Sequence, residues 1–253
     1  MGRPIKRLRL RFIAMLSLVI FFSSGCFLNN LAKPGVKVFS HEKPTTQPVD
    51  ITFFQNEGCT WQTENYAACA ETSVFKKMGC SAIYRPSEYY SLLTPSVPLV
   101  ECNYLPLYQE SPDQNPEGLY NSGCSMPSLM RLIAYQDGNY ILVKNIADLQ
   151  ALFTPVESAE EALGYAVAAT GAQPLFGFEA PKEYRYEVDT LDETFVKTID
   201  GGYEVLLYDY QLCGCGPHST YLTKIQVFTN GDINQLEYLP VFANPEDDGL
   251  CVD

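Results

Sequence analysis

Residues 158–171 read SAEEALGYAVAATG, and this stretch decides the fold class. It opens on a capping-box pattern, in which the hydroxyl of Ser158 can accept the amide of Glu161 and the Glu161 carboxylate can reach back to the amide of Ser158. Gly171, a residue type that readily ends helices, closes the stretch. Between them, apolar residues recur at helical spacing and predict a helix with one buried face. That face consists of Ala162, Leu163, Ala166, Val167 and Thr170.

Extended segments follow this helix and indicate a sheet. They cover residues 184–188, 194–199, 203–210, 220–228 and 233–239. The intervening tripeptides 200–202 (DGG) and 230–232 (NGD) tolerate positive φ and are typical of tight turns. Within 220–228, apolar side chains alternate with Lys224 and Gln226, as in an antiparallel sheet with one wet face. The fold class is therefore α+β, with a helix packed on a curved antiparallel β-meander over residues 146–253.

The region upstream, residues 51–145, is rich in cysteine and irregular. Its patterns predict a strand at 51–55, a helix over 65–78 and a helical turn at 88–93 behind Ser87. Prolines and glycines predict a long loop over 103–123. Nearer the meander, they predict a strand at 140–144 and a short helix at 147–153.

The segment before this region has the three parts of a bacterial signal peptide. Five basic residues precede an apolar run over residues 12–22, and small residues lead to Cys26. The run is too short to span a bilayer. The small residues and the cysteine resemble the lipobox of bacterial lipoproteins, with Ser23 where a leucine is usual. The resemblance implies cleavage after residue 25 and lipid attachment at Cys26.

Export and lipid attachment set the expected location of the chain. We expect it to face outside the cytoplasm, held to the cell membrane or outer membrane by lipid alone. Residues 26–50 contain three prolines and no sustained period, so we expect a flexible tether there. The whole chain has a net charge of −13, and the signal segment carries five positive charges, so the remainder carries −18. Such an acidic surface disfavours nucleic-acid binding.

Eight cysteines remain if Cys26 is lipidated, and an exported chain favours their pairing as disulfides. Eight cysteines allow about 105 pairings. Five of them lie in residues 51–145 and three lie later, so full pairing requires an odd number of bridges between the two regions. The candidates are Cys59, Cys69, Cys80, Cys102, Cys124, Cys213, Cys215 and Cys251.

The segment 213–218 (CGCGPH) concentrates residues that can carry chemistry. Two thiolates and an imidazole, from Cys213, Cys215 and His218, are ligands that suit zinc or copper. No fourth ligand is evident, and export favours disulfides, so we expect neither a metal nor another cofactor. Cysteines so close together would be strained if bridged to each other, so each is expected to pair with a distant partner.

A second candidate site uses Cys69 as a thiol nucleophile. Gln62 precedes Cys69 by a few residues, and His218 opens a later strand, an arrangement that resembles papain-type peptidases that process bacteriocin leaders. The resemblance implies Cys69 as nucleophile, His218 as base and Gln62 as oxyanion donor. It departs from the family at Ala70, where a glycine is usual. A thiol hydrolase is therefore the alternative function, and it requires Cys69 to be free.

The C-terminal region resembles PepSY-type domains over roughly residues 155–240. The carrying residues are 158–162 (SAEEA), 202–205 (GYEV), 225–227 (IQV) and 230–232 (NGD), with the CGCGPH segment as an interruption. This resemblance implies binding and the regulation of secreted enzymes. We therefore expect a non-catalytic binding or regulatory lipoprotein, whose partner is an unidentified protein or small molecule.

Overall fold

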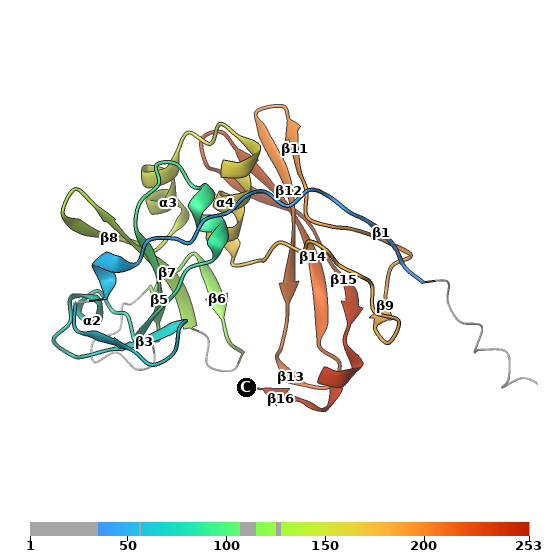
Figure 1. Cartoon of the computed structure of the whole chain (residues 1–253), viewed down its shortest axis with the longest axis horizontal. Helices are drawn as coiled ribbons and strands as arrows, with labels where there is room; N and C mark the ends of the chain where they lie inside the picture. The colour runs from blue at the N-terminus through green and yellow to red at the C-terminus, as the bar shows by residue number, and fades with distance from the viewer. Residues whose placement is uncertain (1–34, 56, 107–114, 125–127, 253) are drawn as a thin grey trace, which may run out of the picture. The chain divides into compact units, whose positions relative to one another are not determined.

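Two antiparallel sheets hold most of the strand residues in the computed structural model, which describes residues 35–55, 57–106, 115–124 and 128–252 (Figure 1). The C-terminal sheet has the strand order β11-β12-β14-β15-β9. Gly201 and Gly231 take positive φ in the tight turns that join β11 to β12 and β14 to β15. The predicted meander is thus present. Its bounds are β9 Arg185–Tyr186, β11 Val196–Ile199, β12 Gly202–Tyr210, β14 Ser219–Phe228 and β15 Ile233–Ala243.

The N-terminal sheet has the order β2-β3-β4-β5-β7-β6, and β8 also pairs with β7. Its longest strand, β7, lies where the sequence predicts no element. One edge of β7 pairs with β5, while β6 and β8 share the other edge in succession. The bounds are β2 Cys59–Trp61, β3 Tyr66–Cys69, β4 Ala82–Tyr84, β5 Leu99–Tyr104, β6 Tyr120–Ser122, β7 Ser128–Gln136 and β8 Asn139–Val143.

Tertiary pairing corrects two predictions in the cysteine-rich region. The expected strand at 51–55 is a 3-10 turn, η1 (Thr52–Phe54). The expected helix over 65–78 is strand β3 followed by a four-residue helix, α2 (Val74–Lys77). The helical period fails because β3 pairs with β2 and β4 on either side, and the sheet then satisfies its backbone groups. The predicted turn behind Ser87 is η2 (Glu88–Leu92).

Helix α4 (Ala159–Thr170) begins and ends where the sequence predicts. Both hydrogen bonds of the capping box between Ser158 and Glu161 are present, and Gly171 ends the helix at φ 73°. The prediction of a single buried face was wrong, because residues 162–169 are all buried. The helix contacts η2 on one side and β11, β12 and β14 on another, so its middle is covered all round. A shorter helix, α3 (Ile146–Phe153), precedes it.

The main core lies around α4 and takes side chains from both sheets. Alternation along β5 shows how the N-terminal sheet contributes. Leu99 points to the α4 core, whereas Val100 points to a second core that contains three of the cysteines. A third core covers the other face of the C-terminal sheet. The expected boundary between residues 145 and 146 falls between β8 and α3, inside one compact unit that begins at Val36.

Residues 36–50, expected to belong to a flexible tether, lie along this folded unit. Strand β1 (Lys37–Phe39) pairs in parallel with β10 (Thr190–Asp192). Further on, the Lys43 ammonium lies 2.9 Å from the Glu88 carboxylate, and the amide of Gln47 donates to the Ser91 hydroxyl. Residues 1–25, Cys26 and the rest of the expected tether up to residue 34 lie outside the described residues. No helix among the described residues is long and apolar enough to cross a membrane.

Candidate binding groove between the two sheets

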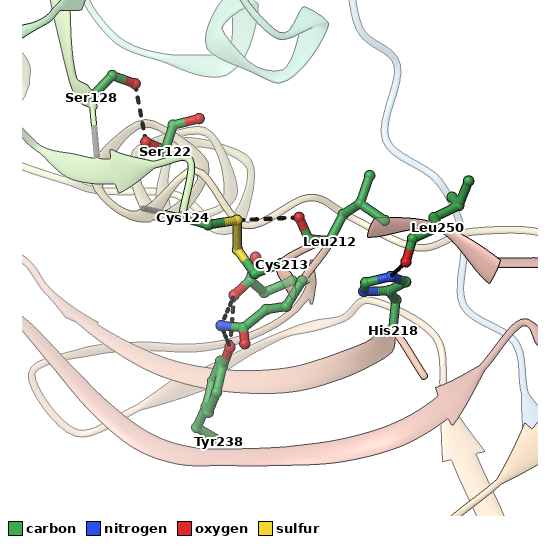
Figure 2. The surroundings of a disulfide bond; sticks show 10 residues. Ser122, Cys124, Ser128, Leu212, Cys213, His218, Tyr238 and Leu250 are labelled. Carbon is green, nitrogen blue, oxygen red and sulfur yellow. Dashed lines mark hydrogen bonds between the residues drawn. A yellow bond between two sulfur atoms is a disulfide. The ribbon is translucent and has the colours of Figure 1, made fainter. Parts of the chain in front are cut away.

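The eight expected cysteines form four disulfides, and one of these joins the two sheets. Cys124 follows β6, and its partner Cys213 follows β12 (Figure 2). Cys215 pairs with Cys251 and ties the short strand β13 (Gly214–Cys215) to β16 (Cys251–Val252). The remaining bridges are Cys59–Cys69 and Cys80–Cys102. As predicted, an odd number of bridges links the two regions, and Cys213 and Cys215 each have distant partners.

The structure does not bring the three residues of the thiol-hydrolase alternative together. Cys69 lies in β3 and is bridged to Cys59. His218 immediately precedes β14 of the other sheet, where it is buried and its Nε2 lies 3.2 Å from the carbonyl oxygen of Leu250 (Figure 2). Gln62 is exposed and donates to the carbonyl of Thr60. In this arrangement, Cys69 has no free thiol and His218 contacts no thiol partner.

The three possible metal ligands of the CGCGPH segment do not form a metal site either. Cys213 and Cys215 are both consumed by disulfides, so neither presents a thiolate. Among the described residues, no group of three or more histidines, cysteines or acids is arranged to hold an ion. Cys213, the first residue of the CGCGPH segment, instead lies at the rim of a hollow, next to the loop that follows β6.

Beside this rim, two adjoining hollows form a groove between the sheets. Their volumes are about 320 Å³ and about 400 Å³, in the range of small-molecule sites. They share Tyr120, Thr170 and Asp209, so they adjoin each other. The C-terminal sheet and the end of α4 line one side, and β6 with the loop after it lines the other. We call this feature the inter-sheet groove.

The floor of the groove follows from strand alternation. On β12, Val205 and Leu207 point into the α4 core, so Asp209 points to the same side. Helix α4 ends at Thr170, and the sheet face beyond it is uncovered there. Cross-strand pairing brings Tyr221 opposite Asp209, and Tyr238 opposite Thr223. The uncovered face therefore carries polar and aromatic side chains.

Asp209 and Tyr238 of the floor make a hydrogen-bonded cluster with Gln211, which follows β12 and lines the second hollow. The hydroxyl of Tyr238 donates to the Asp209 carboxylate at 2.7 Å. The Gln211 amide nitrogen donates to the same Tyr238 oxygen at 2.6 Å. Burial raises the pKa of Tyr238, and the hydrogen bond to Asp209 raises it further, so the phenol stays protonated. Figure 2 shows the Tyr238 hydroxyl directed toward the side of the sheet where Cys213 lies.

The opposite wall centres on Tyr120, which reaches back into a buried polar cluster. Its hydroxyl pairs with that of Tyr90, and Tyr90 donates to the Glu101 carboxylate at 3.0 Å. Burial raises the pKa of Glu101 to about 7. The Tyr120 ring lies so close to Gly171 that a Cβ there would come within 2.4 Å of it. The end of α4 therefore fixes the position of this wall.

The sequence analysis did not select the groove residues. One signal was present: Asp209 interrupts an otherwise apolar alternating face on the strand 203–210. Polar residues at the end of a buried strand face indicate an uncovered part of that face. No comparison supplied these residues, since no protein family, curated protein or solved structure matches this chain.

Proposed function

We propose that this protein is an exported lipoprotein, anchored through Cys26, that binds a ligand in the inter-sheet groove without catalysing a reaction. The observation that carries the proposal is the cluster of Asp209, Gln211 and Tyr238 on the groove floor. Polar groups that converge in a preformed hollow are typical of ligand sites. The disulfide between Cys124 and Cys213 supports it further, because a covalent link next to the groove limits how far its walls can separate.

Export is supported by the four disulfides, since such bonds persist outside the cytoplasm. The resemblance of residues 155–240 to PepSY-type domains implies the same class of role. Binding and regulation need no activated nucleophile, and the bridged state of Cys69 agrees with that.

The groove can be tested with a fragment library and isotope-labelled protein. We expect the amide shifts caused by weakly binding polar aromatic fragments to cluster at Tyr120, Asp209 and Tyr238. A Thr170→Arg variant, which places a long side chain between the two hollows, should abolish these shifts. Fragments that cluster elsewhere and ignore this variant would contradict the proposal.

The anchor can be tested in cells by feeding a labelled fatty acid. We expect the label in the full-length protein and its loss in Cys26→Ser, with the variant released from the membrane fraction. Label retained in Cys26→Ser would place the lipid elsewhere.

Peptide mass spectrometry of the non-reduced protein separates the binding role from the thiol hydrolase. We expect a Cys59–Cys69 linked peptide and no alkylation of Cys69. A Cys69 thiol that alkylates in the native protein would favour the hydrolase.

A further inference from the structure

We propose that the ligand of the inter-sheet groove is a neutral oligosaccharide. This inference rests on the proposed function, because it names the ligand class for the same groove. Three features carry it: the charge of the lining, the hydrogen-bonding groups left open on the floor, and a stacked pair of tyrosines.

The charge of the lining disfavours an anionic ligand and offers only weak attraction to a cationic one. Among the described residues that line the two hollows, Asp209 is the one charged side chain, and none is lysine, arginine or histidine. A phosphate or carboxylate would therefore meet repulsion from Asp209 with no compensating cation. A cationic ligand would find a single carboxylate that already accepts from Tyr238. The rest of the polar lining is hydroxyl and amide, which suits a neutral polar ligand.

The open groups of the floor match sugar hydroxyls. An ionised carboxylate accepts several hydrogen bonds, and an amide offers both a donor and an acceptor. In the described structure, Asp209 Oδ2 accepts from Tyr238 and from Gln211 Nε2, while Asp209 Oδ1 and Gln211 Oε1 have no partner. A sugar hydroxyl can donate to such an oxygen and still accept a bond from a neighbouring group. The floor thus presents two spare acceptor oxygens to a ligand.

Tyr238, which lines the groove, supplies the apolar surface that a sugar ring needs, and Tyr221 stacks on it. The rings of Tyr221 and Tyr238 stack with centroids 4.8 Å apart and an interplanar angle of 8°. Tyr238 is 41% exposed despite this stacking and its hydrogen bonds. A pyranose has flat faces of C–H groups and a rim of hydroxyls. An aromatic ring with a polar tip can contact both kinds of group at once.

The size of the site suits a chain of sugars. The two adjoining hollows together leave room for more than one ring. A peptide that binds by strand addition needs a free sheet edge. Asp209 lies on β12 and Thr223 on β14, and each of these strands has a neighbouring strand on both sides. This part of the floor therefore offers side chains to a ligand, whereas the edge strand β6 lies in the opposite wall.

The test is calorimetric titration of the non-reduced mature protein with neutral tetrasaccharides. Suitable probes are β-1,4-linked N-acetylglucosamine, β-1,4-linked glucose and α-1,4-linked glucose. We expect at least one to bind, with an affinity that does not change between about 0.05 M and about 0.5 M NaCl, because a neutral ligand is not screened. A sulfated oligosaccharide and an oligolysine peptide serve as anionic and cationic comparisons, and we expect neither to compete.

Variants locate the binding. Tyr238→Ala removes the ring and should weaken binding at least about tenfold. Tyr238→Phe removes the hydroxyl, and Asp209→Asn replaces one acceptor oxygen with an amide donor, so each should weaken binding about fivefold. Tyr66→Phe, on the other sheet, is the matched control and should bind as the wild type does. Circular dichroism and thermal unfolding check that each variant is folded. The two milder variants keep the test informative if Tyr238→Ala does not fold.

Each outcome decides one of the two proposals. If none of the three tetrasaccharides binds while fragments still occupy the groove, the sugar assignment fails and the binding role stands. Binding of oligolysine alone, weakened by salt and by Asp209→Asn, would replace the sugar with a basic peptide. A tetrasaccharide that binds equally well to Tyr238→Ala would place the sugar outside the groove. Failure of the fragments as well would overturn the groove itself.

Discussion

Glu101 is an acidic residue whose surroundings raise its pKa. Alternation along β5 places it between Val100 and Cys102, both in the second core, and so turns it toward α4. There its carboxylate accepts from the Tyr90 hydroxyl, and Tyr90 pairs with Tyr120 on the groove wall. Burial is the largest cause of its raised pKa, because removing water penalises the charged form.

This residue predicts a pH dependence of stability. The folded-state pKa of about 7 exceeds the ordinary value of 4.5, so the folded protein binds the proton more tightly than the unfolded chain. Stability is therefore lost as the pH rises from 4.5 to about 7 and stays lower above that range. We therefore compare the free energy of unfolding of Glu101→Gln with that of the wild type at two pH values. The variant's stability relative to the wild type should be greater at pH about 8.5 than at pH about 4, by about 1–3 kcal/mol.

Urea unfolding of both proteins at both pH values measures this effect. Glu64→Gln, at an exposed glutamate, is the control and should show the same difference from the wild type throughout. A Glu101→Gln variant whose stability tracks the wild type at every pH would show that the carboxyl is not buried in solution.

Helix α4 shows how local pattern and packing act on one element. Its start is a local matter, since Ser158 and Glu161 satisfy each other's amides. Its end is both local and tertiary, because Gly171 has φ 73° and also lies against the Tyr120 ring. The two ends therefore predict different results for substitution.

At the start of α4, Ser158→Ala removes one half of the capping box. The amide of Glu161 loses its acceptor, so we expect a loss of about 1 kcal/mol in the free energy of unfolding. Ser87→Ala is the matched control, because Ser87 precedes η2 without a side-chain capping bond. Chemical denaturation compares the two, and equal losses would contradict a capping role for Ser158.

At the end of α4, Gly171→Ala should cost more than backbone strain alone. Alanine pays about 1–2 kcal/mol in the left-handed region, and its methyl group would also displace Tyr120 from the groove wall. Gly177 has φ 67° with no atom within 4 Å of a Cβ, so Gly177→Ala isolates the strain. We expect Gly171→Ala to lose more thermal stability than Gly177→Ala and to bind ligand more weakly. Equal effects of both substitutions would argue against the Tyr120 contact.

At the scale of the whole molecule, Cys124–Cys213 is the covalent link between the sheets. It spans 89 residues of sequence, against 10 for Cys59–Cys69. A cross-link that closes a longer loop removes more entropy from the unfolded chain. We expect Cys124→Ala/Cys213→Ala to lose about 2–5 kcal/mol in the free energy of unfolding.

The double variant Cys59→Ala/Cys69→Ala is the comparison and should lose less stability. Denaturant unfolding without reductant measures both, and fragment binding reports on the groove. We expect groove binding to weaken when Cys124–Cys213 is removed and to persist without Cys59–Cys69. The reverse order would show that the link between the sheets does not support the groove.

Prediction from sequence succeeded where neighbouring residues interact with one another. The capping box, the glycine turns and the alternating strands of the meander are local patterns, and the structure contains them. Prediction failed at 65–78, where a helical period gives way to β3, because pairing with β2 and β4 outweighs a weak local preference. It also missed β7, whose role depends on partners far away in sequence.

The order of residues was enough to indicate an α+β chain with a C-terminal meander, an even set of cysteines and at least one bridge between its two regions. These features follow from local backbone preferences and from counting. Which cysteines pair, that α4 is buried on every side, and that Asp209, Gln211 and Tyr238 meet beside Cys213 came from the three-dimensional arrangement alone. Those contacts join residues tens of positions apart, and the packing of two sheets around one helix brings them together.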